Sequence, residues 1–158
     1  MFGFDSDMLF RIPALIAALT IHEYAHARAA VAMGDPTPRF LGRVTLNPIP
    51  HIDPIGLILL FIAGFGWAKP VEVNPRNFRD GRRGMFVVSL AGAGANIALG
   101  FVAWFLLMLL GELNLIGMVW QKTLWQLYRY NLMFAVFNLI PIPPLDGSKV
   151  LMSLLPGH

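Results

Sequence analysis

The feature that most constrains the fold is a run of 28 uncharged residues, 84–111. As a helix rising about 1.5 Å per residue, a run of this length crosses the ~30 Å hydrocarbon core of a bilayer. Inside lipid every backbone polar group needs a partner within the protein, and a helix satisfies them all within one segment. The run therefore predicts a membrane-spanning α-helix.

The composition also favours a membrane protein. Hydrophobic residues make up 56% and charged residues 13% of the 158 residues, with a mean hydropathy of +0.62, whereas a soluble domain is about 25% charged. The net charge of +3 and the pI near 9.7 would suit a nucleic-acid-binding protein. Basic cytoplasmic loops explain them more simply, so we expect no nucleic-acid partner. Because the chain has no cysteine, a metal would need histidine and carboxylate ligands.

Two further apolar runs predict membrane spans. Residues 8–33 form the first span, and residues 124–140 form a third of marginal length. Residues 55–67 are too short and contain glycines, so we expect a re-entrant or interfacial segment, and whether it crosses the bilayer is left open. The predicted fold class is an α-helical polytopic membrane protein with a three-span core, in one domain over residues 1–158.

Two short segments outside the spans predict a small membrane-associated β element. Residues 40–47 have the pattern of a short strand, and residues 71–74 are its expected partner. At the N-terminus, residues 1–8 have neither a basic region nor a small-residue cleavage site. We therefore expect no removable signal peptide.

The first span contains a pattern typical of a zinc site. His22 and His26 are four residues apart, so on a helix they project from one face, one turn apart. With Glu23 they form the H-E-x-x-H arrangement, in which two imidazoles bind zinc and the carboxylate acts as general base. Glu23 lies about 100° around the helix from His22, so it can flank the metal without binding it.

A catalytic zinc site takes about three protein ligands and keeps one position open. Asp146, after the third span, is the best candidate for the third ligand, because ionisable residues at membrane depth are costly and usually functional. Two alternatives remain open at this stage. The two histidines could be a buried hydrogen-bonded pair, and Glu23 could be a structural partner of Arg28 or of a backbone group.

The distribution of basic residues predicts the orientation. Residues 68–84 carry five lysines or arginines, whereas residues 112–123 carry only Lys122. The positive-inside rule places residues 68–84 in the cytoplasm. The second span then runs outward and the third returns, which brings Asp146 to the cytoplasmic side at about the depth of the histidines.

Four other polar residues are candidates for supporting roles. His51 and Asp53, in a proline-rich loop, could support the ligands, supply a fourth ligand or only shape the loop. Asn96 lies within the second span and could hydrogen-bond across helices, or bind substrate backbone or an oxyanion. Asn138 precedes a proline-rich break and could hydrogen-bond peptide groups that the prolines leave without partners.

Several motifs follow one another along the chain. They are His22, Glu23 and His26 in the first span, Ser89 through Asn96 in the second, and residues 137–141 with Pro144 to Gly147 after the third. Taken in this order, they resemble the site-2 protease family of intramembrane zinc metalloproteases. Residues 47–56 and 66–70 resemble those of a short bacterial branch without a PDZ domain, and the resemblance covers nearly the whole chain.

The resemblance implies a site and a substrate. It implies His22, His26 and Asp146 as the ligands of one zinc ion, Glu23 as the catalytic glutamate, and a substrate that is itself a transmembrane helix. The chain departs from the family where Gly92 is followed by alanine instead of proline, which predicts a straighter second span.

The function expected from the sequence is an intramembrane zinc metalloprotease in the cell membrane, of bacterial inner-membrane type, that acts on transmembrane proteins. A strand near Arg43 to Leu46 is expected to pair with an unwound substrate segment, with Arg43 and Val44 as candidate substrate-binding residues. Two rivals are a catalytically silent zinc-binding scaffold and a metal transporter. Glu23 argues against the first, and the scarcity of polar residues in 84–111 argues against the second. The oligomeric state and the identity of the substrate are left open.

Overall fold

The structure, a computed structural model, describes residues 7–63 and 66–156, and this part of the chain is mostly helical. The sequence prediction for residues 1–8 falls almost wholly outside the described residues. The elements in chain order are α1 (Met8–Met33), α2 (Thr37–Phe40), a 3-10 turn (Ile49–His51), α3 (Pro54–Ala63), a second 3-10 turn (Pro75–Asn77), α4 (Gly81–Glu112), α5 (Met118–Asn138) and α6 (Asp146–Leu154).

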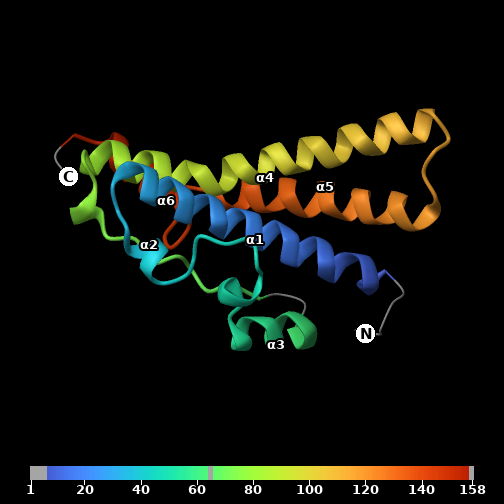
Figure 1. Cartoon of the computed structure of the whole chain (residues 1–158), viewed down its shortest axis with the longest axis horizontal. Coiled ribbons are helices and arrows are strands. Elements are labelled where there is room, and N and C mark those ends of the chain that lie inside the picture. Colours follow the sequence, from blue (N-terminus) through green and yellow to red (C-terminus); the bar gives the residue numbers. More distant parts are fainter. Residues whose placement is uncertain (1–6, 64–65, 157–158) are drawn as a thin grey trace.

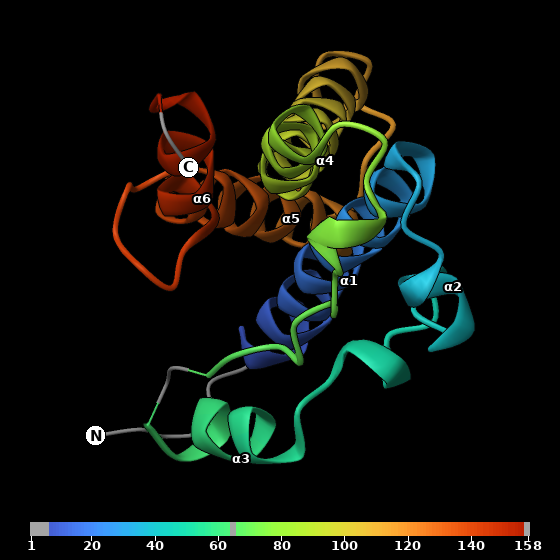
Figure 2. The same cartoon turned by 90° about the vertical axis from the view of Figure 1, so that its left-hand side faces the viewer.

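Three long helices form the body of the molecule. Helices α4 and α5 run antiparallel side by side, and α1 packs against both of them (Figure 1). The chain then returns through α6, which packs on α4. Helix α3 stands apart from this bundle in both views (Figures 1 and 2).

Small side chains let these helices approach closely. Ala18, Ala27 and Ala30 of α1 and Ala93 and Ala103 of α4 are at most 1% exposed. Contacts between small residues are typical of helices that associate in membranes, where backbones pack closely. Helix α4 continues through Gly92 and Ala93 without a break, as expected from the absence of proline there.

Two of the predicted spans have the length and hydropathy of membrane helices. Among the described residues, α1 and α4 are the helices that meet both conditions, and α1 has the predicted bounds of 8–33. The third predicted span, residues 124–140, corresponds to α5, a helix of 21 residues that is not in that group. The second half of α4 exposes large apolar side chains, including Phe101, Val102 and Phe105, as expected of a surface that faces lipid.

The predicted β element is wrong. In the described part of the chain, residues 40–47 form the end of α2, a turn and a bend, and residues 71–74 have no regular secondary structure. The nearest feature is a single antiparallel bridge between Ile52 and Ala68. Side chains explain part of the difference, because His51 bonds the carbonyl of Thr45 and Asp35 bonds the N–H of Asn74, which are groups that a strand ladder would use.

The predicted re-entrant segment contains a short helix. Residues 55–67 include most of α3 and residues 64–65, which lie outside the described residues. Helix α3 begins where Asp53 accepts hydrogen bonds from the backbone of Ile55 (2.8 Å) and Gly56 (3.1 Å). These contacts satisfy two of the amides left without partners at a helix start.

Candidate metal centre

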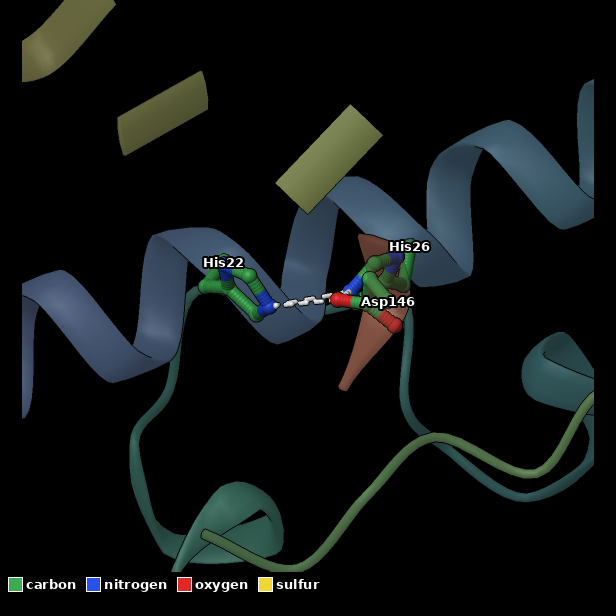
Figure 3. Close-up of side chains that lie close together, drawn as sticks. All are labelled: His22, His26 and Asp146. Atoms are coloured by element: carbon green, nitrogen blue, oxygen red, sulfur yellow. Dashed lines mark hydrogen bonds and ion pairs between the residues drawn. The ribbon is translucent and has the colours of Figure 1, made fainter. Parts of the chain in front are cut away.

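Three side chains from two distant parts of the chain converge between α1 and α6 (Figure 3). His22 Nε2 and His26 Nε2 lie 3.0 Å apart, and Asp146 Oδ2 lies 3.1 Å from the first and 2.9 Å from the second. All three residues are buried. The helical spacing of the histidines and the position of Asp146 at the first residue of α6 create this triangle.

The triangle fits one zinc ion. Zinc bonds of about 2.0–2.1 Å in a tetrahedral site place neighbouring ligand atoms about 3.3 Å apart, close to the separations observed. Two imidazoles and one carboxylate are also a donor set used by catalytic zinc sites, which keep a fourth position open. The three predicted ligands, His22, His26 and Asp146, therefore lie close enough together to form a metal site, and their spacing suits zinc.

Each histidine is fixed through its second ring nitrogen. His22 Nδ1 lies 2.7 Å from Asn96 Oδ1, and His26 Nδ1 lies 2.7 Å from the carbonyl oxygen of Val88. Both acceptors lie on α4 and take a hydrogen bond from Nδ1–H, so a neutral ring that binds a metal would do so through its Nε2 lone pair.

The Asn96 side chain belongs to a longer network. Its Nδ2 donates to the carbonyl of Ala18 (2.9 Å) and to Asn131 Oδ1 (2.8 Å), and Asn131 Nδ2 donates to the carbonyl of Leu127 (2.8 Å). The network ties all three long helices to His22. Sequence reasoning missed Asn131; the only signal in the sequence was an amide side chain within a predicted span, and its burial and its partner appear only in the structure.

Close contact between α4 and the histidines requires a glycine. A Cβ added to Gly92 would lie 2.6 Å from His26 Nε2 and 2.7 Å from His22 Nε2. Any side chain there would collide with the atoms that face the metal. Gly92 therefore lets the α4 backbone form one wall of the site.

The carboxyl of Asp146 is held in its ionised form. Burial acts to raise the pKa of Asp146, but the hydrogen bonds of its carboxylate with His22 and His26 and the charge of Lys149 hold it well below its usual value. Lys149 Nζ lies 3.2 Å from Asp146 Oδ1. The side chain therefore offers the metal an anionic Oδ2 atom.

Glu23 lies next to the ligands and outside their triangle. It is buried, and its Oε2 accepts a hydrogen bond from the backbone N–H of Val71 at 3.0 Å. Glu23, the three ligands, Ser89 and Lys149 all line a cavity of about 270 Å³. Glu23 thus has a backbone partner, the N–H of Val71, as one alternative from the sequence expected. Glu23 also lines the cavity that contains the three predicted ligands.

The other predicted site residues do not join the triangle. His51 Nε2 lies 2.8 Å from the carbonyl of Thr45, Asp53 begins α3, and Arg43 donates to the carbonyls of Lys69 and Pro70. Val44 lies in a bend, so the strand expected there for pairing with a substrate is not formed.

Asn138 lines the cavity, whereas Asn96, His51 and Asp53 are not among its lining residues. Its Nδ2 donates to the carbonyl of Phe134, one turn earlier in α5, at 3.0 Å. The hydrogen bond expected with the proline-rich break is therefore replaced by a bond within its own helix.

Comparison with known proteins identifies the family. The model of "Peptidase family M50" matches residues 113–158. A Bacillus subtilis (strain 168) protein named "Putative zinc metalloprotease YwhC" is 41% identical over 158 residues, which cover 96% of this chain and 71% of that protein. The chain belongs to peptidase family M50, the site-2 proteases, which are membrane-embedded metalloproteases.

More distant relatives share a smaller part of their length. "Putative zinc metalloprotease Rip2" of Mycobacterium tuberculosis (strain ATCC 25618 / H37Rv) is 34% identical over 146 residues, or 86% of this chain and 53% of that protein. The protein of the same name from Mycolicibacterium smegmatis is 30% identical over 145 residues, with the same coverage. No solved structure matches the chain.

Proposed function

We propose that the chain is an intramembrane zinc endopeptidase that hydrolyses peptide bonds in or near transmembrane helices of membrane proteins. The observation that carries the proposal is the position of Glu23, whose buried carboxylate lines the same cavity as His22, His26 and Asp146. A site that served only to hold zinc would have no need for an ionisable group there.

When bound, zinc acts as a Lewis acid that lowers the pKa of a water molecule to about 7. Glu23 accepts the proton of the attacking water and passes it to the leaving amine. The N–H of Val71 on Oε2 fixes the carboxylate in position. Asn96 and the Val88 carbonyl hold the two imidazoles in the required tautomer and orientation.

The setting of the site supports a helical substrate. The two histidines lie in the middle of α1, a helix with the length and hydropathy of a membrane span. A peptide at that depth hides its carbonyls in helical hydrogen bonds, so cleavage requires local unwinding, which glycine or proline in the substrate makes easier. Such a substrate is cleaved by regulated intramembrane proteolysis.

The proposed topology has three spans, α1, α4 and α5, in the cell membrane. Helix α5 contains polar side chains, and a membrane span tolerates these where neighbouring helices supply hydrogen-bond partners. Asn131 has such a partner in Asn96 of α4. The basic residues between α3 and α4 favour a cytoplasmic location for that segment, by the positive-inside rule. The active site then opens toward the cytoplasm.

The test uses purified protein in liposomes with a transmembrane peptide substrate. We expect a zinc chelator to abolish cleavage and zinc to restore it. Glu23→Gln should lower the rate by about 10³-fold or more while zinc content stays at one ion per chain. The matched control is Glu72→Gln, at an exposed glutamate near the site, which should cleave at the wild-type rate.

Other outcomes separate the rival functions. Cleavage that survives Glu23→Gln would overturn the role of that residue. A wild-type protein that binds zinc and cleaves nothing would be a scaffold. Zinc flux across the liposome membrane without cleavage would identify a transporter.

A further inference from the structure

A buried hydroxyl in the metal-site cavity has no role in the fold. Ser89 lies on α4, is 1% exposed and lines the same cavity as Glu23 and the three ligands. Within residues 7–63 and 66–156, its Oγ atom has no hydrogen-bond partner. Burying a hydroxyl without a partner costs stability, so folding alone does not explain this serine.

The other serines of the described chain behave differently. Ser148 Oγ donates to the carbonyl of Leu145 (2.7 Å), and Ser153 Oγ donates to the carbonyl of Val150 (2.6 Å). Buried helical serines commonly satisfy themselves through backbone carbonyls in this way. The Ser89 hydroxyl does not, although it lies within a continuous helix.

Ser89 lies on the part of α4 that contacts the metal ligands. The residue before it, Val88, accepts the hydrogen bond of His26 Nδ1 through its carbonyl. The residue one turn later, Gly92, lies against the Nε2 atoms of both histidines. Ser89 thus lies between two contacts to the metal centre, and the residue lines the cavity where a substrate peptide would be cleaved.

We propose that Ser89 is a catalytic residue whose hydroxyl donates a hydrogen bond to the carbonyl oxygen of the scissile peptide. This inference rests on the proposed function. During hydrolysis the water oxygen bonds to the carbonyl carbon, and the π electron pair moves onto the carbonyl oxygen. Glu23 moves the proton of the water to the nitrogen, and the C–N bond breaks. The Ser89 hydrogen bond strengthens as the carbonyl oxygen becomes negative, so it lowers the barrier.

The test compares Ser89→Ala with Ser89→Thr and measures kcat, KM, zinc content and the unfolding temperature of the zinc-free protein. Ser89→Ala should lower kcat by about 100-fold and leave KM within about twofold, because the bond forms mainly in the transition state. Zinc content should not change. The unfolding temperature should stay the same or rise, since no hydrogen bond of the folded protein is lost.

Two further variants complete the design. Ser89→Thr keeps the hydroxyl and should retain kcat within about tenfold of wild type. The matched control is Ser153→Ala, which removes a buried hydroxyl from α6 that bonds only its own helix. It should leave kcat and KM unchanged.

Three results would overturn the inference and leave the proposed function standing. They are a Ser89→Ala enzyme with wild-type kcat, a loss of kcat that comes with a lower unfolding temperature or lost zinc, and a Ser89→Thr enzyme as slow as Ser89→Ala. If the wild-type protein binds zinc and cleaves no substrate, the proposed function itself fails and the inference fails with it.

Discussion

The metal centre and the connecting segment between α1 and α4 (residues 34–63 and 66–80) use buried polar groups in different ways. In the metal centre, side chains on regular helices face one another, and their supporting acceptors come from a neighbouring helix. In the connecting segment, buried side chains hold irregular backbone in place. Arg43 binds the carbonyls of Lys69 and Pro70, and Asp35 binds the backbone N–H of Asn74.

The difference shows that the two regions serve the same site in different ways. The helices set the positions of the ligands, whereas the connecting segment places the Val71 N–H on the Glu23 carboxylate. Damage to the helices should therefore affect zinc binding. Damage to the connecting segment should affect stability and cleavage while zinc binding persists.

The largest effect, a loss of zinc affinity, is expected for Gly92→Val in α4. Its side chain would overlap the Nε2 atoms of His22 and His26, so zinc affinity should fall by more than the roughly 100-fold that loss of a supporting residue costs. Zinc content measured by elemental analysis checks this result. The matched control is Gly94→Ala, two residues away, because a Cβ there meets nothing within 4 Å. Normal zinc content in Gly92→Val would show that α4 does not wall the site.

The next effect is expected for Asn96→Ala, which removes the acceptor of His22 Nδ1–H. Loss of such a partner should weaken zinc binding by about 10- to 100-fold. Asn131→Ala, one step further along the network, should have a smaller effect in the same direction. Competition with a zinc-binding dye measures both affinities. If Asn131→Ala weakened zinc binding more than Asn96→Ala, the direct contact between Asn96 and His22 would not be the main support of that histidine.

The sequence predicted the helical region well. On a helix, the H-E-x-x-H spacing places both histidines on one face. The apolar runs that predict α1 and α4 also predict that this face lies within the thickness of the membrane. Asp146 lies 120 positions after His26 in the chain. It could still be predicted as the third ligand, because a carboxylate at the end of a membrane span is costly unless it has a function. Asn131 and the carbonyl of Val88 were missed, because helix-to-helix contacts depend on how the helices pack.

The connecting segment was predicted poorly for a physical reason. Residues 40–47 have strand-like composition, but that signal is local and depends on context. Here the side chains of Asp35, Arg43 and His51 satisfy backbone groups that a strand ladder would otherwise satisfy. Such long-range bonds between side chain and backbone leave no periodic pattern in a sequence, so the β element was expected and the helical turns were not.

Arg43→Met tests whether the connecting segment affects stability and cleavage without affecting zinc binding. The change removes hydrogen bonds to the carbonyls of Lys69 and Pro70 and should cost about 2–3 kcal/mol. The apparent unfolding temperature should fall by about 5 °C or more. Zinc affinity should stay near wild type, while cleavage slows because Val71 no longer fixes Glu23. Arg76→Met, at an exposed arginine of the same segment, is the control. Loss of zinc in Arg43→Met would contradict the division between the regions.

The smallest effect, a loss of stability that depends on pH, is expected for Asp35→Asn. Burial acts to raise the pKa of Asp35, but hydrogen bonds from Asn77, from Thr37 and from the backbone of Asn74 lower it below the usual value. The folded protein therefore favours the ionised form. Its contribution to stability is complete above the unfolded pKa of about 3.9 and is lost as the pH falls through the lower, folded value.

At pH 7 the Asp35→Asn variant should be less stable than wild type by about 1 kcal/mol, because an amide replaces a carboxylate that accepts four hydrogen bonds. The difference should shrink as the pH falls below about 4, since the carboxyl of the unfolded wild-type chain then takes up its proton before the folded one does. Unfolding measured at several pH values checks this, with exposed Glu72→Gln as control. A constant difference across this range would mean that the charge of Asp35 does not hold the turn after α1.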